Sequence, residues 1–204
     1  MKLKWWEKTV EYLFVAYAVA KKKMAFGIPL DGDHERAGDA IFAAANRWIL
    51  IEFKRDRITI ASEKEKFANF ETARQMLGAS DGHHYIVYGE SSKNERGSMY
   101  LDLKYVTYFS GVQKTFDEML ASGAGKAAFS QYLKRLTSLK QIPAGSSGGG
   151  LMMDDYSLVA GVGESNAIVE CVSLAQVQRA LNLSREIERP APTHDISRSR
   201  GMER

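Results

Sequence analysis

The sequence predicts an α/β fold, with a mixed central sheet of about four strands flanked by helices. Three features lead to this prediction: an apolar stripe at helical spacing near the start of the chain, a continuous apolar strand in its first third, and two aromatic-rich strand candidates further on. The chain has 204 residues, of which 45% are hydrophobic, so it is large enough for one sizeable folded core.

The first element is a helix predicted over residues 5–23. Its apolar side chains recur every three or four positions and form one stripe, made of Trp6, Val10, Leu13, Phe14 and Tyr17. Glu11 borders this stripe and is expected to be half-buried. Glu7 lies one turn earlier, among lysines, and is expected to be more solvated.

A loop and a pair of strands are predicted next. Residues 26–38 are rich in Gly, Pro and Asp and predict the loop. Two short strands, 39–44 and 48–55, are predicted to form a hairpin. The second begins with four apolar residues, Trp48–Ile51, so we expect a central strand that is covered on both faces. Charge appears abruptly at its end, in Glu52-Phe53-Lys54-Arg55-Asp56.

A second helix is predicted to begin at Ser62, because Ser62-x-x-Glu65 has the spacing of a capping box, and to end at Gly78. The pattern further along the chain predicts strands at 84–88 and 100–109, and a helix at 113–140 that is interrupted near Gly123.

Composition divides the chain into four parts: a core (1–143), a Gly/Ser-rich joint (144–150), a C-terminal extension (151–188) and a tail (189–204). The extension is predicted to pack on the core through a strand pair, 156–162 and 167–172, and a short helix, 174–181. The tail has two prolines, four arginines and few apolar residues, and is therefore predicted to be disordered.

Charge and cysteine content restrict the partners. The net charge is only +3, which permits nucleic-acid binding without requiring it. The single cysteine, Cys171, excludes an intramolecular disulfide and a cysteine-based zinc cluster. The apolar run near the start is too short for a bilayer helix, and its flanking charges do not fit a signal peptide. We therefore expect a cytoplasmic protein with no membrane partner, and a homodimer stays open.

The residues that stand apart chemically are Asp39 and, after twelve intervening residues, Glu52 and Lys54. Side chains alternate along a strand, so Glu52 and Lys54 should project from one face, about 6.6 Å apart along the backbone. The hairpin would bring Asp39 beside them. Carboxylates at the end of an apolar strand are costly unless their charge is compensated, and Mg²⁺ suits such a pair. The carbonyl of Phe53 is a further candidate ligand, and Lys54 would orient or help to deprotonate the attacking water.

This pattern resembles that of the PD-(D/E)xK nuclease superfamily, over about residues 5–109. The resemblance implies a restriction-endonuclease-like core that hydrolyses phosphodiester bonds of nucleic acid, with DNA as the expected substrate and Mg²⁺, or Mn²⁺ as a substitute, as the cofactor. Asp39 matches the metal-binding aspartate, Glu52 and Lys54 match the (D/E)xK pair, and Glu11, rather than Glu7, matches the helix glutamate that often completes the site. All four of these matched residues would then be catalytic, and the metal ligands would be Asp39, Glu52, Glu11 and the backbone carbonyl of Phe53. Gly38, not proline, precedes Asp39, which the family often tolerates.

Other interpretations of the same residues stay open. In a purely structural interpretation, Asp39 caps a turn, while Glu52 and Lys54 belong to a solvated strand end with weak surface ion pairs. The main functional alternative is a catalytically inactive module of the same fold that binds nucleic acid or a protein, and a third is a structural or inhibitory protein.

His83 and His84 predict a polar strand end. Basic residues that either follow a phosphate backbone or simply face solvent are Lys64, Lys66, Arg74, Lys126, Lys134, Arg135 and Lys140.

Overall fold

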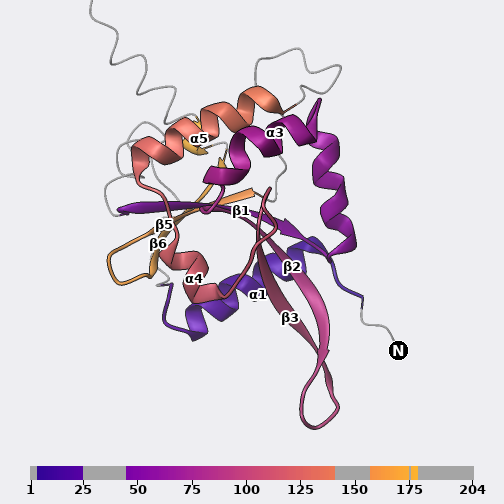
Figure 1. Cartoon of the computed structure of the whole chain (residues 1–204). Helices are drawn as coiled ribbons and strands as arrows, with labels where there is room; N and C mark the ends of the chain where they lie inside the picture. Colours follow the sequence, from indigo (N-terminus) through magenta and orange to yellow (C-terminus); the bar gives the residue numbers. More distant parts are fainter. Residues whose placement is uncertain (1–3, 25–44, 141–156, 175, 179–204) are drawn as a thin grey trace, which may run out of the picture.

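The computed structural model describes residues 4–24, 45–140, 157–174 and 176–178. Helices lie on both sides of one sheet, with α3 and α5 on one face and α1 and α4 on the other (Figure 1). The elements, in chain order, are α1 (Glu7–Ala20), β1 (Arg47–Lys54), the 3₁₀ helix η1 (Ile58–Lys66), α3 (Phe70–Leu77), the 3₁₀ turn η2 (Gly78–Ser80), β2 (His84–Lys93), β3 (Met99–Thr107), β4 (Gln113–Lys114), α4 (Phe116–Ala121), α5 (Lys126–Leu139), β5 (Ser157–Val162) and β6 (Ile168–Ser173).

The described strands form one mixed sheet of six, in the order β4-β3-β2-β1-β5-β6. β1 and β2 run parallel, and the other neighbouring pairs are antiparallel. The predicted α/β class with a mixed, helix-flanked sheet is therefore confirmed, while the number of strands is larger than the four expected. β2 and β3 continue beyond the sheet as a projecting hairpin (Figure 1).

The described neighbours of β1 are β5 and β2. Its antiparallel partner is β5, near the C-terminal end of the chain, and the register there pairs Glu52 with Ser157. On its other edge, Glu52 is paired with Ile86 of β2. Among the described strands, both edges of β1 are thus occupied at Glu52. The hairpin predicted between 39–44 and 48–55 involves a strand outside the described residues, and Asp39 is part of that strand.

The C-terminal strands are placed differently from the prediction. The strand pair predicted at 156–162 and 167–172 is confirmed as β5 and β6. It is part of the central sheet rather than an extension packed on a finished core, because β5 is the direct neighbour of β1. The predicted joint, 144–150, and tail, 189–204, fall outside the described residues.

β1 is covered on both faces, as its continuous apolar sequence predicts. Alternate side chains pack into two separate clusters: Trp48 and Leu50 on the side of α3 and α5, and Ile49, Ile51 and Phe53 on the side of α1 and α4. Each of these side chains is at most 1% exposed. Burial of side chains of this size contributes about 1.5–3 kcal/mol each, so the packing of β1 determines how its charged end is held.

α1 packs against this strand by a narrower stripe than expected. Val10, Phe14 and Ala18 are fully buried, and the Phe14 ring meets the Phe53 ring edge-on at 5.5 Å. Trp6 and Tyr17, which the predicted stripe includes, are 78% and 38% exposed. None of the helices within the described ranges has the length and apolar character needed to cross a bilayer.

The helix predicted to begin at Ser62 is wrong in its start. Ser62 lies inside η1 and its hydroxyl donates to the carbonyl of Thr59, so it caps nothing. The α-helix begins only at Phe70, where the Asn69 side chain accepts a hydrogen bond from the Thr72 N–H at 3.0 Å. This shift leaves η1, with its charged residues, directly beyond the end of β1.

The predicted helix at 113–140 is divided in a similar way. Thr115 and Glu118 form a true capping box that starts α4, after the short strand β4. α5 begins at Lys126, after the glycines that predict the interruption. It ends at Leu139, and the residue that follows, Lys140, pairs with Phe67 in an isolated antiparallel bridge and so comes to lie beside the end of η1.

Candidate functional site

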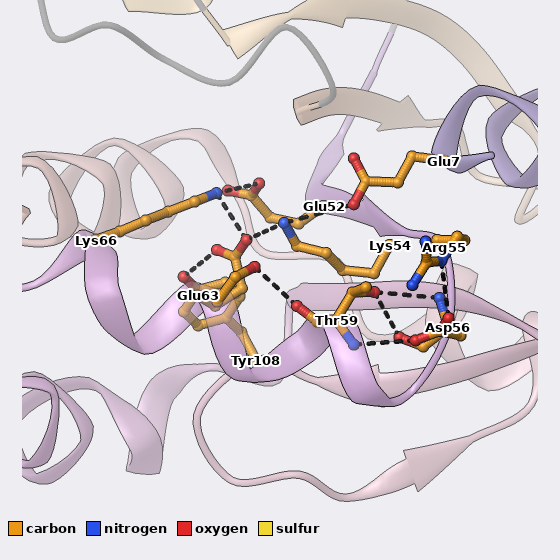
Figure 2. Close-up of polar contacts among 10 residues, drawn as sticks. Glu7, Glu52, Lys54, Arg55, Asp56, Thr59, Glu63, Lys66 and Tyr108 are labelled. Carbon is orange, nitrogen blue, oxygen red and sulfur yellow. Dashed lines mark hydrogen bonds and ion pairs between the residues drawn. The ribbon is translucent and has the colours of Figure 1, made fainter.

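Charged side chains from several elements meet at the end of β1 (Figure 2). Glu52 and Lys54 project from the face of β1 that also carries Trp48 and Leu50, as the strand periodicity predicts. Glu52 is 1% exposed and Lys54 is 7% exposed. The interpretation of this segment as a solvated strand end is therefore wrong, and the charges need partners inside the fold.

The partners of Glu52 are mainly lysines. One carboxylate oxygen lies 3.4 Å from the Lys140 ammonium, and the other lies 3.6 Å from the Lys66 ammonium. The Ser157 side chain, opposite Glu52 on β5, adds a hydrogen bond. Burial by itself would raise the pKa of Glu52, but the charges of Lys140 and Lys66 outweigh it and lower that pKa to about 2. Glu52 is therefore an ionised carboxylate at neutral pH.

Lys54 has a carboxylate partner that the sequence interpretation missed. Its ammonium lies 2.5 Å from Oε1 of Glu63, and Glu7 is further away at 3.9 Å. Burial tends to lower the pKa of Lys54, yet the charge and hydrogen bond of Glu63 raise it above its usual value, with help from Glu7 and Glu52. Lys54 is accordingly a protonated ammonium held in a fixed position.

Glu63 connects the two halves of the site. It is 2% exposed, its Oε1 lies 2.7 Å from the Lys66 ammonium, and its Oε2 accepts a hydrogen bond from the Tyr108 hydroxyl at 2.6 Å. Lys66 thus contacts both Glu63 and Glu52 (Figure 2). The sequence signal that could have found Glu63 is its three-residue spacing from Lys66, which places both side chains on one side of a 3₁₀ turn.

A tight turn after β1 directs η1 toward this cluster. The Asp56 carboxylate accepts a hydrogen bond from the Thr59 N–H at 3.0 Å, and the Thr59 hydroxyl donates to the Asp56 carbonyl at 2.7 Å. Side chains of this kind satisfy backbone groups locally and favour turns over continued strand. Because the chain reverses at once, Glu63 returns to the end of the strand that carries Lys54.

The helix glutamate nearest the site is Glu7, not Glu11. The Trp5 indole N–H donates to the Arg55 carbonyl at 2.5 Å and ties the start of α1 to the end of β1. Gly89 makes room for this contact, since a Cβ there would lie 2.6 Å from the indole nitrogen. Glu7, in the first turn of α1, therefore faces Lys54, whereas Glu11 pairs with Lys8 at 2.7 Å. The role of Glu11 as a metal ligand beside Asp39 stays a prediction, because Asp39 lies outside the described residues.

His84 is part of the inner wall rather than a polar strand end. Its ring is fully buried, stacks on Tyr108 at 4.0 Å, and shares a hydrogen bond with the Tyr132 hydroxyl, 2.8 Å from Nδ1. Burial holds the pKa of His84 well below its usual value, in spite of the charge of Glu52. A neutral imidazole thus lines the site beside the charged network.

The donor chemistry of this site suits a hard divalent cation, because Glu52 and Glu63 offer buried carboxylate oxygens. Their charge is already matched by Lys54, Lys66 and Lys140, so an entering cation must compete with an ammonium group. Within the described ranges, which do not include Asp39, no group of three or more His, Cys, Asp or Glu side chains is placed to hold a metal ion.

Comparison with models of known protein families, with curated protein sequences and with solved structures finds no match. The resemblance to the PD-(D/E)xK superfamily therefore stays a prediction from the sequence motif.

Proposed function

We propose that this chain is a divalent-metal-dependent nuclease of the PD-(D/E)xK class that hydrolyses phosphodiester bonds, with DNA as the expected substrate. The observation that carries the proposal is the burial, on one face at the end of β1, of an ionised Glu52 beside a protonated Lys54. Burying both charges costs stability, and strongly perturbed charges of this kind gather at functional sites.

Each residue has a distinct part in this proposal. Glu52 is the proposed metal ligand on β1, with the Phe53 carbonyl and Asp39 as the further ligands that the resemblance implies. A bound divalent ion supplies Lewis acidity, which polarises a phosphoryl group and lowers the pKa of a water molecule. Lys54, held protonated by Glu63, offsets negative charge on the phosphoryl oxygens and positions the water by donating hydrogen bonds. A protonated Lys54 does not act as the base that removes the proton of that water.

Lys66 and Lys140 suit contact with the phosphate backbone. Their side chains are 21% and 13% exposed, so part of each reaches the rim of the site, while the Lys66 ammonium itself is buried against Glu52 and Glu63. Positive charge at the rim draws in a polyanion that the buried carboxylates would otherwise repel.

A second function is favoured by the same lysines. Because Lys66 and Lys140 already neutralise Glu52, the cluster holds together without a metal ion, as a non-catalytic module that binds nucleic acid or a protein would require. In that case the three ammonium groups bind phosphate and no bond is broken.

The two functions separate when binding and cleavage are measured apart. Fluorescence anisotropy with a labelled DNA duplex reports binding, and nicking of a supercoiled plasmid with Mg²⁺ reports cleavage. For a nuclease, the wild type does both, and Glu52→Gln binds DNA but leaves the plasmid intact. A wild type that binds DNA and leaves the plasmid intact with either Mg²⁺ or Mn²⁺ supports the binding module instead.

A further inference from the structure

Lys66 occupies a particular place in the cluster. Its ammonium lies between carboxylates that come from two different elements, 3.6 Å from Oε2 of Glu52 on β1 and 2.7 Å from Oε1 of Glu63 on η1 (Figure 2). Both carboxylates are at most 2% exposed. Two buried carboxylates repel each other unless a cation lies between them, and in this chain the Lys66 ammonium is that cation.

We propose that Lys66 is an internal counter-ion that holds the position of a divalent cation between Glu52 and Glu63. The divalent ion binds by displacing the Lys66 ammonium, so Glu63 joins Glu52 as a carboxylate ligand of the ion, and Lys66 limits the affinity of the site for that ion. This inference rests on the proposed function, because it takes a divalent ion as the ligand of the site.

Lys66 is the lysine that can leave. Its side chain is 21% exposed, against 9% for Lys54 and 13% for Lys140. It is the last residue of η1, and its exposed part is the stem, whereas its ammonium is buried against the two carboxylates. Moving that ammonium into water therefore costs free energy, which is why Lys66 limits the affinity of the site. Lys54 is held more closely, by Glu63 at 2.5 Å with Glu7 behind it.

Both carboxylates keep a partner after the exchange. When the Lys66 ammonium leaves, Glu52 keeps Lys140 and Glu63 keeps Lys54 and the Tyr108 hydroxyl. A divalent ion with several retained waters then replaces one positive charge by two. The site thereby gains one positive charge, which an incoming phosphate group neutralises. The affinity for the divalent ion should therefore be higher when the substrate is bound, and the affinity for the substrate higher when the ion is bound.

The test is the affinity for Mn²⁺, measured by isothermal titration calorimetry on the full chain without substrate. Lys66→Met removes the competing ammonium and keeps the aliphatic stem. We expect its Mn²⁺ affinity to rise by at least about tenfold, since one unit charge at this range shifts a proton equilibrium by roughly 10- to 1,000-fold. Lys64→Met is the matched control: it removes the same charge from an exposed position of η1 and should change the affinity less than about threefold.

Glu63→Gln tests the second half of the proposal. It leaves Lys66 in place and removes one carboxylate, so Mn²⁺ should bind at least about tenfold more weakly than to the wild type. Adding this change to Lys66→Met should cancel the gain of the single variant. An unchanged or weaker affinity in Lys66→Met, or an unchanged affinity in Glu63→Gln, overturns the proposal.

Folding does not obscure the outcome. If Lys66→Met is unfolded in EDTA, circular dichroism should show that Mn²⁺ restores its fold, and a variant that stays unfolded with Mn²⁺ contradicts the proposal. Failure of the nuclease function can be distinguished from failure of this proposal. If the wild type never cleaves but Lys66→Met binds Mn²⁺ more tightly than the wild type, the nuclease function fails and the proposal for Lys66 stands. Conversely, a chain that cleaves with an unchanged Mn²⁺ affinity in Lys66→Met keeps the function and loses this inference.

Discussion

Replacing Glu52 by glutamine should expose the strength of the charge network through the pH dependence of stability. The pKa of Glu52 is lowered from its ordinary 4.5 to about 2, and one pKa unit corresponds to about 1.4 kcal/mol, so its ionised form contributes about 3 kcal/mol to folding. A carboxyl group with a lowered folded-state pKa contributes fully above its unfolded value of 4.5. The contribution is lost as the pH falls from there toward 2.

Urea unfolding of the wild type and of Glu52→Gln, from pH 7 to pH 3, measures this contribution directly. The difference in free energy of unfolding should be about 3 kcal/mol at pH 7 and should shrink by about 2 kcal/mol at pH 3. Taking the difference removes the titration of groups that both proteins share. Glu65→Gln, exposed on the same 3₁₀ helix, should stay within about 0.5 kcal/mol of the wild type. A difference that is constant with pH, or below about 1 kcal/mol at pH 7, refutes the account of Glu52.

Two stability predictions concern the surroundings of the site. Tyr108→Phe removes the hydroxyl that donates to Glu63 at 2.6 Å and should lower the free energy of unfolding by about 1–3 kcal/mol; equal urea midpoints for variant and wild type would contradict this. Gly161→Ala should cost about 1–3 kcal/mol, because its Cβ would lie 3.0 Å from the Trp48 ring in the neighbouring strand. Gly82→Ala, where a Cβ meets nothing within 4 Å, is its control, and equal melting temperatures for the two would count against the packing described for β1.

The position of Glu52 and Lys54 on one face of β1 is predictable from the sequence, because it depends only on the alternation of side chains along a strand. A strand alternates its side chains whatever its neighbours are, so two positions two residues apart share a face. The four apolar residues from Trp48 to Ile51 likewise indicate a strand covered on both sides, and the structure confirms it. The order of the neighbours of β1 has no such local signal, since β5 reaches it from the far end of the chain.

Capping patterns show why the inner partner of Lys54 is hard to predict. Ser62-x-x-Glu65 and Thr115-x-x-Glu118 have the same spacing, yet only the second starts an α-helix. The first lies in a 3₁₀ helix, whose three-residue turn points Glu63 inward and leaves Glu65 exposed. When that stretch is interpreted as an α-helix, Glu65 receives a capping role and the sequence gives no reason to place Glu63 beside Lys54.

The central claim, that Glu52 and Lys54 form a hydrolytic site, is tested most directly by plasmid cleavage with Lys54→Met. Methionine keeps the buried stem of Lys54 and removes its ammonium, so both Glu52 and Glu63 remain to bind metal. The account predicts that the wild type nicks supercoiled DNA with Mg²⁺ or Mn²⁺ and not with EDTA. Lys54→Met should lose roughly two to three orders of magnitude in rate while binding DNA as before, and Lys64→Met should cleave normally. A wild type that cleaves no nucleic acid with either ion, or a Lys54→Met variant that cleaves as fast as the wild type, would contradict it.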